Sequence, residues 1–144
     1  MKFDEIRNMA NADMKIDGTE LDIESLKIPQ LHNKYLNLYH DERLRLKQMR
    51  SKFKELVRDK WEYYTGKMSE EELSRRGWEP FQLKVLKGDL DRYIDADSQV
   101  MVESDKIAYQ EEKVEYLQSV LKSITSRGWD IKNAIEWRKF INGI

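Results

Sequence analysis

The feature that most constrains this chain is the absence of glycine and proline from residues 30–64. These two residues interrupt α-helices most readily, so a run of this length without them predicts one long helix. At about 1.5 Å per residue, such a helix extends for roughly 50 Å. Its apolar side chains fall within an arc of about 100° in helical projection, a width that one packing partner covers. We call them the apolar stripe: Leu31, Tyr35, Leu38, Tyr39, Leu46, Met49, Phe53, Leu56, Val57 and Tyr64.

The composition is typical of a helical protein with a thin core. Of the 144 residues, 37% are charged and 40% apolar, and the mean hydropathy is -0.82. The absence of cysteine excludes a disulfide framework and a thiolate metal site, and it fits a reducing compartment. No apolar run approaches the roughly 18 residues of a membrane span, and no signal-peptide pattern follows Met1. We therefore expect a soluble intracellular protein of mainly α fold, without a membrane partner.

Turn signals organise residues 1–144 into a single helical domain. Its N-terminal region, residues 1–66, would begin with a short, weakly docked helix over residues 1–12. The long helix would end at Gly66, because glycine is favoured just after a helix C-terminus. The connecting segment, residues 67–97, is expected to contain one short helix and an irregular part.

Within the connecting segment, Ser69 and Glu72 have the spacing of a capping box and predict the start of that short helix. It would stop at Gly77. The apolar residues of the next stretch, residues 78–88, alternate as in a strand but also fit a helical turn. We favour a helix or a loop there.

The C-terminal region, residues 98–144, predicts two further helices. Cap residues around Asp97 precede a long helix whose apolar residues recur seven apart and form a packing seam. Gly128 would break this helix, and Asp130 would cap a last helix over residues 131–141. The expected architecture is long antiparallel helices plus a short C-terminal helix.

Basic residues concentrate in the middle of the long helix. The chain holds 26 basic and 27 acidic residues, yet residues 41–67 carry nine basic and five acidic ones, so this segment has a net charge of +4 and the remainder -5. Five cations fall within about 80° of one another in the helical projection, beside the apolar stripe. We call these residues the basic stripe: Arg43, Lys47, Arg50, Lys54 and Arg58.

Two interpretations of the basic stripe remain open. A run of like charges is most often a solvated helix face, but such faces usually intersperse both signs. Cations with no carboxylate among them repel one another unless an anion lies along them. Trp61 projects in the same direction one turn beyond Arg58, and a cationic track that ends in an aromatic ring is typical of sequence-tolerant single-strand binding. Tyr64, by contrast, is expected to pack in the core.

The apolar residues of the last helix spread over roughly 220°, too wide an arc for one packing partner. Either this helix is buried inside the domain, or one flank packs on its own subunit and the other on a second copy. We favour self-association, because large apolar patches are rarely left exposed. The candidate oligomerisation residues are Ile131, Ile135, Trp137, Phe140 and Ile141.

No motif points to an enzyme, a cofactor or a metal. The Gly-Lys pair at residues 66–67 matches only the end of a phosphate-binding loop, because Trp61 stands at the first glycine position and Met68 at the last position. The only histidines, His32 and His40, lie eight residues apart without a carboxylate spacing that suits a metal. We expect no catalytic residue and no metal ligand.

Two segments carry a resemblance to a known family. In residues 57–66 a basic helix runs into Tyr-Tyr-Thr-Gly, and residues 125–132 contain a Ser-Arg-Gly-Trp turn. In these motifs the chain resembles the UvsY family, the recombination mediators of T-even-type bacteriophages. The resemblance covers nearly the whole chain and is loose over residues 78–97.

The resemblance implies a function and a set of partners. It implies a non-enzymatic mediator in the cytoplasm of the infected bacterial host, which binds single-stranded DNA and forms a ring-like homo-oligomer, a hexamer or heptamer. Such a mediator loads the phage recombinase, UvsX-like, onto DNA covered by the phage single-strand-binding protein. The alternative is a helical protein-interaction adaptor whose basic face docks an acidic partner.

The resemblance also implies two DNA-binding positions. Basic residues that the family uses for single-stranded DNA align on Arg58 and Lys60, with Arg and Lys exchanged. In projection Lys60 lies with the apolar stripe, so it must extend along the helix edge, or the helix must distort, for both to touch one strand. The expected DNA-binding residues are Arg43, Lys47, Arg50, Lys54, Arg58, Lys60 and Trp61.

Overall fold

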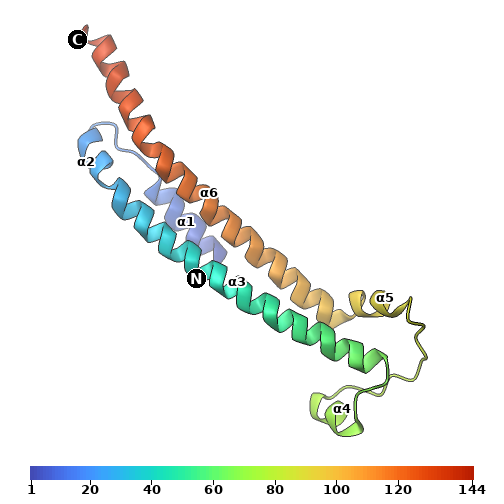
Figure 1. Ribbon diagram of the computed structural model, residues 1–144. Helices are drawn as coiled ribbons and strands as arrows, with labels where there is room; N and C mark the ends of the chain where they lie inside the picture. The colour runs from blue at the N-terminus through green and yellow to red at the C-terminus, as the bar shows by residue number, and fades with distance from the viewer. The chain divides into compact units, whose positions relative to one another are not determined.

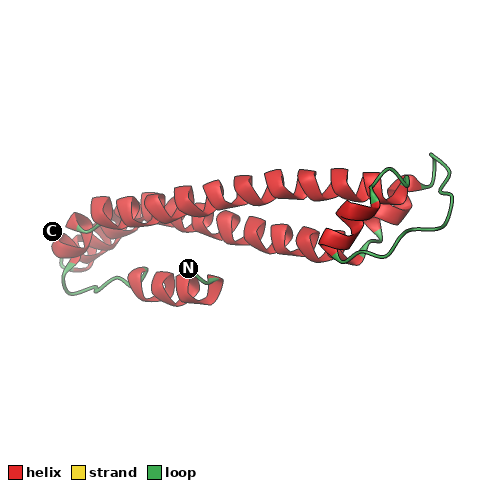
Figure 2. Ribbon diagram, turned by 90° about the horizontal axis from the view of Figure 1, so that it is seen from below, coloured by secondary structure: helices red, strands yellow, loops and turns green.

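The computed structural model describes residues 1–144 as helices joined by turns and loops, with no strand (Figures 1 and 2). The helices are α1 (Phe3–Asp13), α2 (Leu21–Leu26), α3 (Ile28–Tyr64), α4 (Glu70–Arg76), α5 (Leu90–Asp95) and α6 (Ser98–Ile141). The mainly α fold built on long antiparallel helices is therefore confirmed. None of these helices combines the length and the apolar character that crossing a membrane requires.

The chain forms two compact units, each with its own core. The first comprises residues 1–44 and 111–144, and the second comprises residues 45–110. The two long helices α3 and α6 contribute to both, because the boundary of the units falls inside each of them.

In the first unit, α1 lies beside the start of α3 and the later part of α6 (Figure 1). The buried core consists of Ile6, Ala10, Tyr35, Leu117, Val120 and Ile124. The expected weak docking of the N-terminal helix is wrong. Phe3, Ile6 and Ala10 are spaced by three and four residues, which places all three on one helix face, and all three are buried.

The expected break in the C-terminal region is also wrong, since α6 continues through Gly128 and Asp130 as one helix. The residue before this glycine, Arg127, explains why the helix continues. Arg127 is buried, and its guanidinium binds Glu24 at 2.6 Å and the carbonyl oxygen of Lys15 at 2.9 Å. A glycine inside a helix costs only about 1 kcal/mol relative to alanine, and these buried contacts outweigh that cost.

The second unit has a smaller core formed by Leu90, Ile94 and Val100, against which side chains of α3 pack. The predicted ends of α4 are confirmed. The Ser69 hydroxyl accepts a hydrogen bond from the Glu72 amide at 3.2 Å, and Gly77 ends the helix with a φ of 69°. The segment that follows α4 is irregular until α5 begins at Leu90.

Candidate nucleic-acid interface

The basic stripe lies on α3, and the winding of this helix within the second unit brings Lys47, Arg50, Lys54 and Arg58 to one face. All five residues are exposed, Arg43 in the first unit and the other four in the second. Lys47 and Lys54 are exposed and form no ion pair within the molecule. Their ammonium groups are therefore available to an external anion.

Arg58 is held only weakly within the molecule. Its Nη2 lies 3.4 Å from Asp59 Oδ1, and the Arg58 side chain is 67% exposed. Asp59 is bound more closely from the other side, because Arg76 Nη1 lies 2.9 Å from its Oδ2. Arg76 thus pairs with the carboxylate that follows Arg58 in the sequence, and the Arg58 guanidinium is left largely exposed.

Trp61 is exposed on the next turn of α3, at 39% of its full accessible area. The Nζ atom of Lys67 lies 4.4 Å from the centre of its ring, in a cation–π contact. Trp61 therefore presents an aromatic surface with a further cation beside it. Tyr64 instead packs edge-to-face on Phe81 at 4.9 Å, which confirms its expected place in the core.

Lys60 is not brought to the surface that carries the basic stripe. It is 5% exposed, and its Nζ lies 3.1 Å from Asp97 Oδ2 and 3.9 Å from the centre of the Trp78 ring. Its side chain neither extends along the helix edge nor requires a distortion of α3. The helical projection placed Lys60 with the apolar stripe, and that placement is confirmed.

Asp97 is the group around which this interior cluster is arranged. Its Oδ1 accepts hydrogen bonds from the amides of Gln99 at 2.9 Å and Val100 at 3.1 Å, so it caps the N-terminus of α6. Its Oδ2 accepts a hydrogen bond from the Tyr64 hydroxyl at 2.7 Å. Burial alone would raise the pKa of Asp97, but the hydrogen bonds from Tyr64 and Lys60 lower the pKa below its ordinary value of 3.8.

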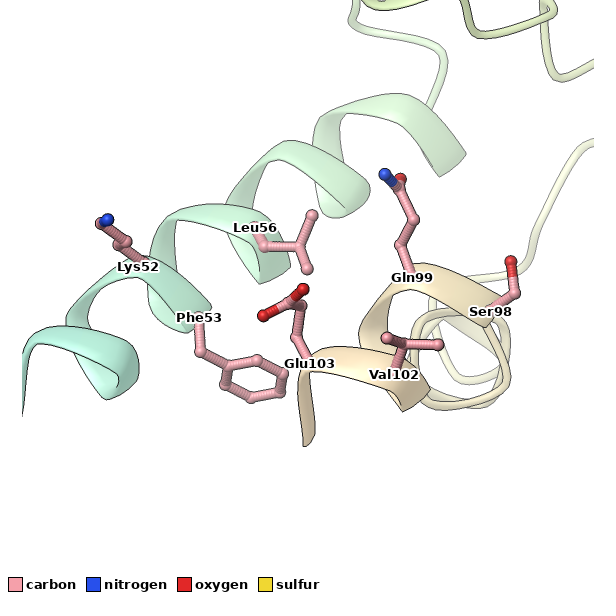
Figure 3. Close-up of a pocket in the computed structure, with 7 residues that line it drawn as sticks. All are labelled: Lys52, Phe53, Leu56, Ser98, Gln99, Val102 and Glu103. Carbon is pink, nitrogen blue, oxygen red and sulfur yellow. The ribbon is translucent and has the colours of Figure 1, made fainter. Parts of the chain in front are cut away.

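A groove that the sequence did not predict lies between α3 and α6 in the second unit (Figure 3). Its volume is about 500 Å³. Figure 3 shows Phe53 and Leu56 of α3 facing Val102 and Glu103 of α6. The complete lining is Lys52, Phe53, Leu56, Ser98, Gln99, Val102 and Glu103. The one sequence feature that relates to this groove is the apolar stripe, to which Phe53 and Leu56 belong.

No group of three or more His, Cys, Asp or Glu side chains in the structure is arranged to hold a metal ion.

The apolar residues near the C-terminus divide into one buried residue and an exposed set. Ile131 is buried within its own unit, so it is not available for contact with a second copy. Trp137 and Phe140 stack on each other with ring centres 5.7 Å apart and are 61% and 74% exposed. Ile135 and Ile141 are exposed as well. In Figure 1 these last turns of α6 project beyond α1 and α2.

Together these features define a class: an all-α protein with a cationic face on one long helix and an exposed apolar helix end. Comparison with known proteins identifies the family. The profile described as "Recombination, repair and ssDNA binding protein UvsY" matches residues 9–144, and the chain belongs to the UvsY family. This is a family of recombination, repair and single-stranded-DNA-binding proteins.

Individual relatives agree with this assignment over almost their full length. The chain is 23% identical to the recombination protein uvsY of Enterobacteria phage T4 over 143 residues, covering 99% of each chain. Its fold is similar to crystal structures of the bacteriophage T4 recombination mediator protein UvsY. Lattice type IV gives a TM-score of 0.85 at 21% identity, covering 97% of this chain and 99% of that one. Lattice type II gives 0.84 at 22% identity, covering 99% and 98%.

Proposed function

We propose that this protein is a non-enzymatic recombination mediator that binds single-stranded DNA through the basic stripe. The observation that carries the proposal is the exposure of Lys47 and Lys54 on the cationic face of α3, without an internal carboxylate partner. Phosphates of an extended strand would lie along the stripe, and a base would stack on Trp61. The T4 relative whose crystal structures share this fold is named a recombination mediator, which supports the same role here.

A mediator must bind the DNA and must also be able to release it to the recombinase. A monomer with about five phosphate contacts binds weakly, with a slope of log affinity against log salt near -3.5 for single strands. Several copies joined in one assembly raise the effective concentration and gain roughly 10²–10⁴ in avidity without new contacts. We propose that such an assembly, a ring of six or seven copies, promotes the loading of a UvsX-like phage recombinase onto DNA covered by the phage single-strand-binding protein.

We propose the exposed end of α6 as the surface that joins the copies. Trp137, Phe140, Ile135 and Ile141 are exposed apolar side chains around one projecting helix end, and exposed apolar surface of this kind marks association surfaces. Ile131 is buried within its own unit and is not part of this surface. The protein would act in the cytoplasm of the infected bacterial host, where the recombinase and the single-strand-binding protein also act.

Light scattering with oligo-dT of increasing length tests assembly and DNA binding together. The proposal predicts one defined assembly whose affinity for oligo-dT rises with strand length and falls steeply between two salt concentrations. A protein-interaction adaptor would instead show little affinity for oligo-dT at any length and would retain binding to an acidic protein surface. That result would contradict the mediator role.

A further inference from the structure

We propose that Lys60 is a positioning residue that holds the DNA-facing end of α3 in place through Asp97 and Trp78, and that it makes no contact with DNA. The inference rests on the proposed function, because it concerns which cations of α3 the strand meets. It assigns different roles to Arg58 and Lys60, two basic residues that are only two positions apart in the sequence.

The Lys60 ammonium group is enclosed by other side chains. Its Nζ is 3.1 Å from Asp97 Oδ2, and the side chains of both residues are 7% exposed. The ring centre of Trp78 lies 3.9 Å from the same nitrogen, and that of Tyr63 lies 5.5 Å away. A carboxylate and two aromatic rings thus surround the ammonium, and a phosphate could reach it only if this cluster opened.

Opening this cluster would be energetically costly. If Lys60 turned to a phosphate, Asp97 would stay buried without its cationic partner, and an unpaired buried charge is strongly unfavourable. The same carboxylate also caps α6 through the amides of Gln99 and Val100. Lys60 therefore stays paired with Asp97, and this ion pair links α3 to the first turn of α6.

Lys60 also contacts a chain of side chains that leads to Arg58. Trp78 takes part in a cluster of contacts that extends to the exposed surface, because the Arg76 guanidinium lies 5.1 Å from its ring centre. Arg76 in turn binds Asp59 at 2.9 Å, which leaves Arg58 with only a long contact to that carboxylate. Through Trp78, Arg76 and Asp59, the buried Lys60 stabilises the surroundings in which Arg58 is presented.

Substitutions distinguish a positioning residue from a DNA contact through the salt dependence. Lys60→Met should weaken oligo-dT binding roughly two- to thirtyfold while leaving the salt slope unchanged, as expected for an indirect effect. Lys54→Met, the matched control on the basic stripe, should make the slope shallower by about 0.7. Asp97→Asn should resemble Lys60→Met, and the double variant should be no weaker than the weaker single variant. A shallower slope for Lys60→Met, or an unchanged affinity, would overturn the proposal.

Lysine footprinting of the unmodified protein gives a second answer that does not depend on the folding of a variant. The full chain is treated with a low dose of an acetylating reagent, with and without oligo-dT, and each lysine is quantified by mass spectrometry. Without DNA, Lys60 should react at least about tenfold more slowly than Lys54, and oligo-dT should protect Lys47 and Lys54 without changing Lys60. Rapid labelling of Lys60 with protection by oligo-dT would overturn the positioning role, whereas a lack of protection at Lys47 and Lys54 would contradict the proposed DNA track itself.

Discussion

The Nη2 atom of Arg127 lies 2.6 Å from Glu24 Oε2, and both side chains are almost completely buried in the first unit. The guanidinium also donates hydrogen bonds to the carbonyl oxygens of Asp13, Met14 and Lys15. These carbonyls lie at the last residue of α1 and just after it, where a helix leaves acceptors without internal partners. One side chain of α6 therefore provides hydrogen-bond donors to the carbonyls at the end of α1 and joins α1 to α2.

Arg127→Met should destabilise the first unit strongly, because it leaves the buried Glu24 with Lys27 as its remaining partner and three carbonyl oxygens without their donor. We expect the midpoint of thermal unfolding to fall by roughly 10 °C or more. Arg127→Lys should recover little of the lost stability, since one ammonium group cannot replace the planar fork of a guanidinium. The exposed Lys122→Met on the same helix is the control and should change the midpoint little; equal effects of the two methionine variants would contradict the role of Arg127.

Gly128→Ala should stabilise the protein by up to about 1 kcal/mol, because alanine favours a helix interior over glycine. A Cβ atom at Gly128 would lie 3.8 Å from Ile28 Cδ1, an ordinary van der Waals contact. Gly66→Ala is the opposite control, because Gly66 has a φ of 73° and alanine there is strained. Urea denaturation measures both changes, and a destabilised Gly128→Ala would indicate that α6 needs a break at this point.

Stability should decrease in acid because carboxylates of both units have lowered pKa values. Burial alone would raise the pKa of Asp13, but hydrogen bonds from Lys34 and Tyr35 lower it below its ordinary value of 3.8. A carboxyl whose pKa is lower in the folded state stabilises the fold above its unfolded pKa, and this stabilisation is lost as the pH falls through the folded pKa. We expect the loss to begin below about pH 5 and to continue towards pH 2.

Asp13→Asn tests the origin of that acid sensitivity. The variant should be less stable than the unmodified protein at neutral pH, and the difference should shrink as the pH falls, because the native carboxyl then becomes neutral too. Urea denaturation at a series of pH values measures this difference. A difference that stays constant down to about pH 2 would show that Asp13 does not contribute through its charge.

Trp137→Ser combined with Phe140→Ser should reduce the assembly to monomers or small species, because it removes the two most prominent rings of the exposed patch. Sedimentation velocity measures the result. Truncation before Asp130 is a less direct test, since it also removes the buried Ile131. Leu26→Ser, on the exposed face of α2, is the control and should leave the assembly intact. A full-size assembly in the double variant would exclude this surface as the interface.

Helical periodicity was sufficient to predict the parts of the site that depend on one element alone. The basic stripe requires only that α3 be regular, and the placement of Lys60 away from Arg58 follows from the same projection. The partners of Lys60 could not be predicted, because Asp97 and Trp78 come from segments distant in sequence. Their contact with Lys60 depends on how α3, α6 and the irregular segment pack together.

The C-terminal region shows the opposite error. The glycine at position 128 indicated a helix end, because local propensity disfavours glycine inside a helix. The buried contacts of Arg127 with Glu24 and with the end of α1 outweigh that preference, and both partners lie more than a hundred residues away. A local signal therefore predicted a break that tertiary contacts remove.

The most direct test of the central claim is the salt dependence of oligo-dT binding by Lys54→Ala combined with Arg58→Ala. Loss of two phosphate contacts should weaken binding and make the slope of log affinity against log salt shallower by about 1.4, with the assembly unchanged. Lys84→Ala combined with Lys87→Ala removes the same charge from exposed positions outside α3 and should preserve the slope. An unchanged affinity and slope for the Lys54 and Arg58 double variant would contradict a DNA site on the basic stripe.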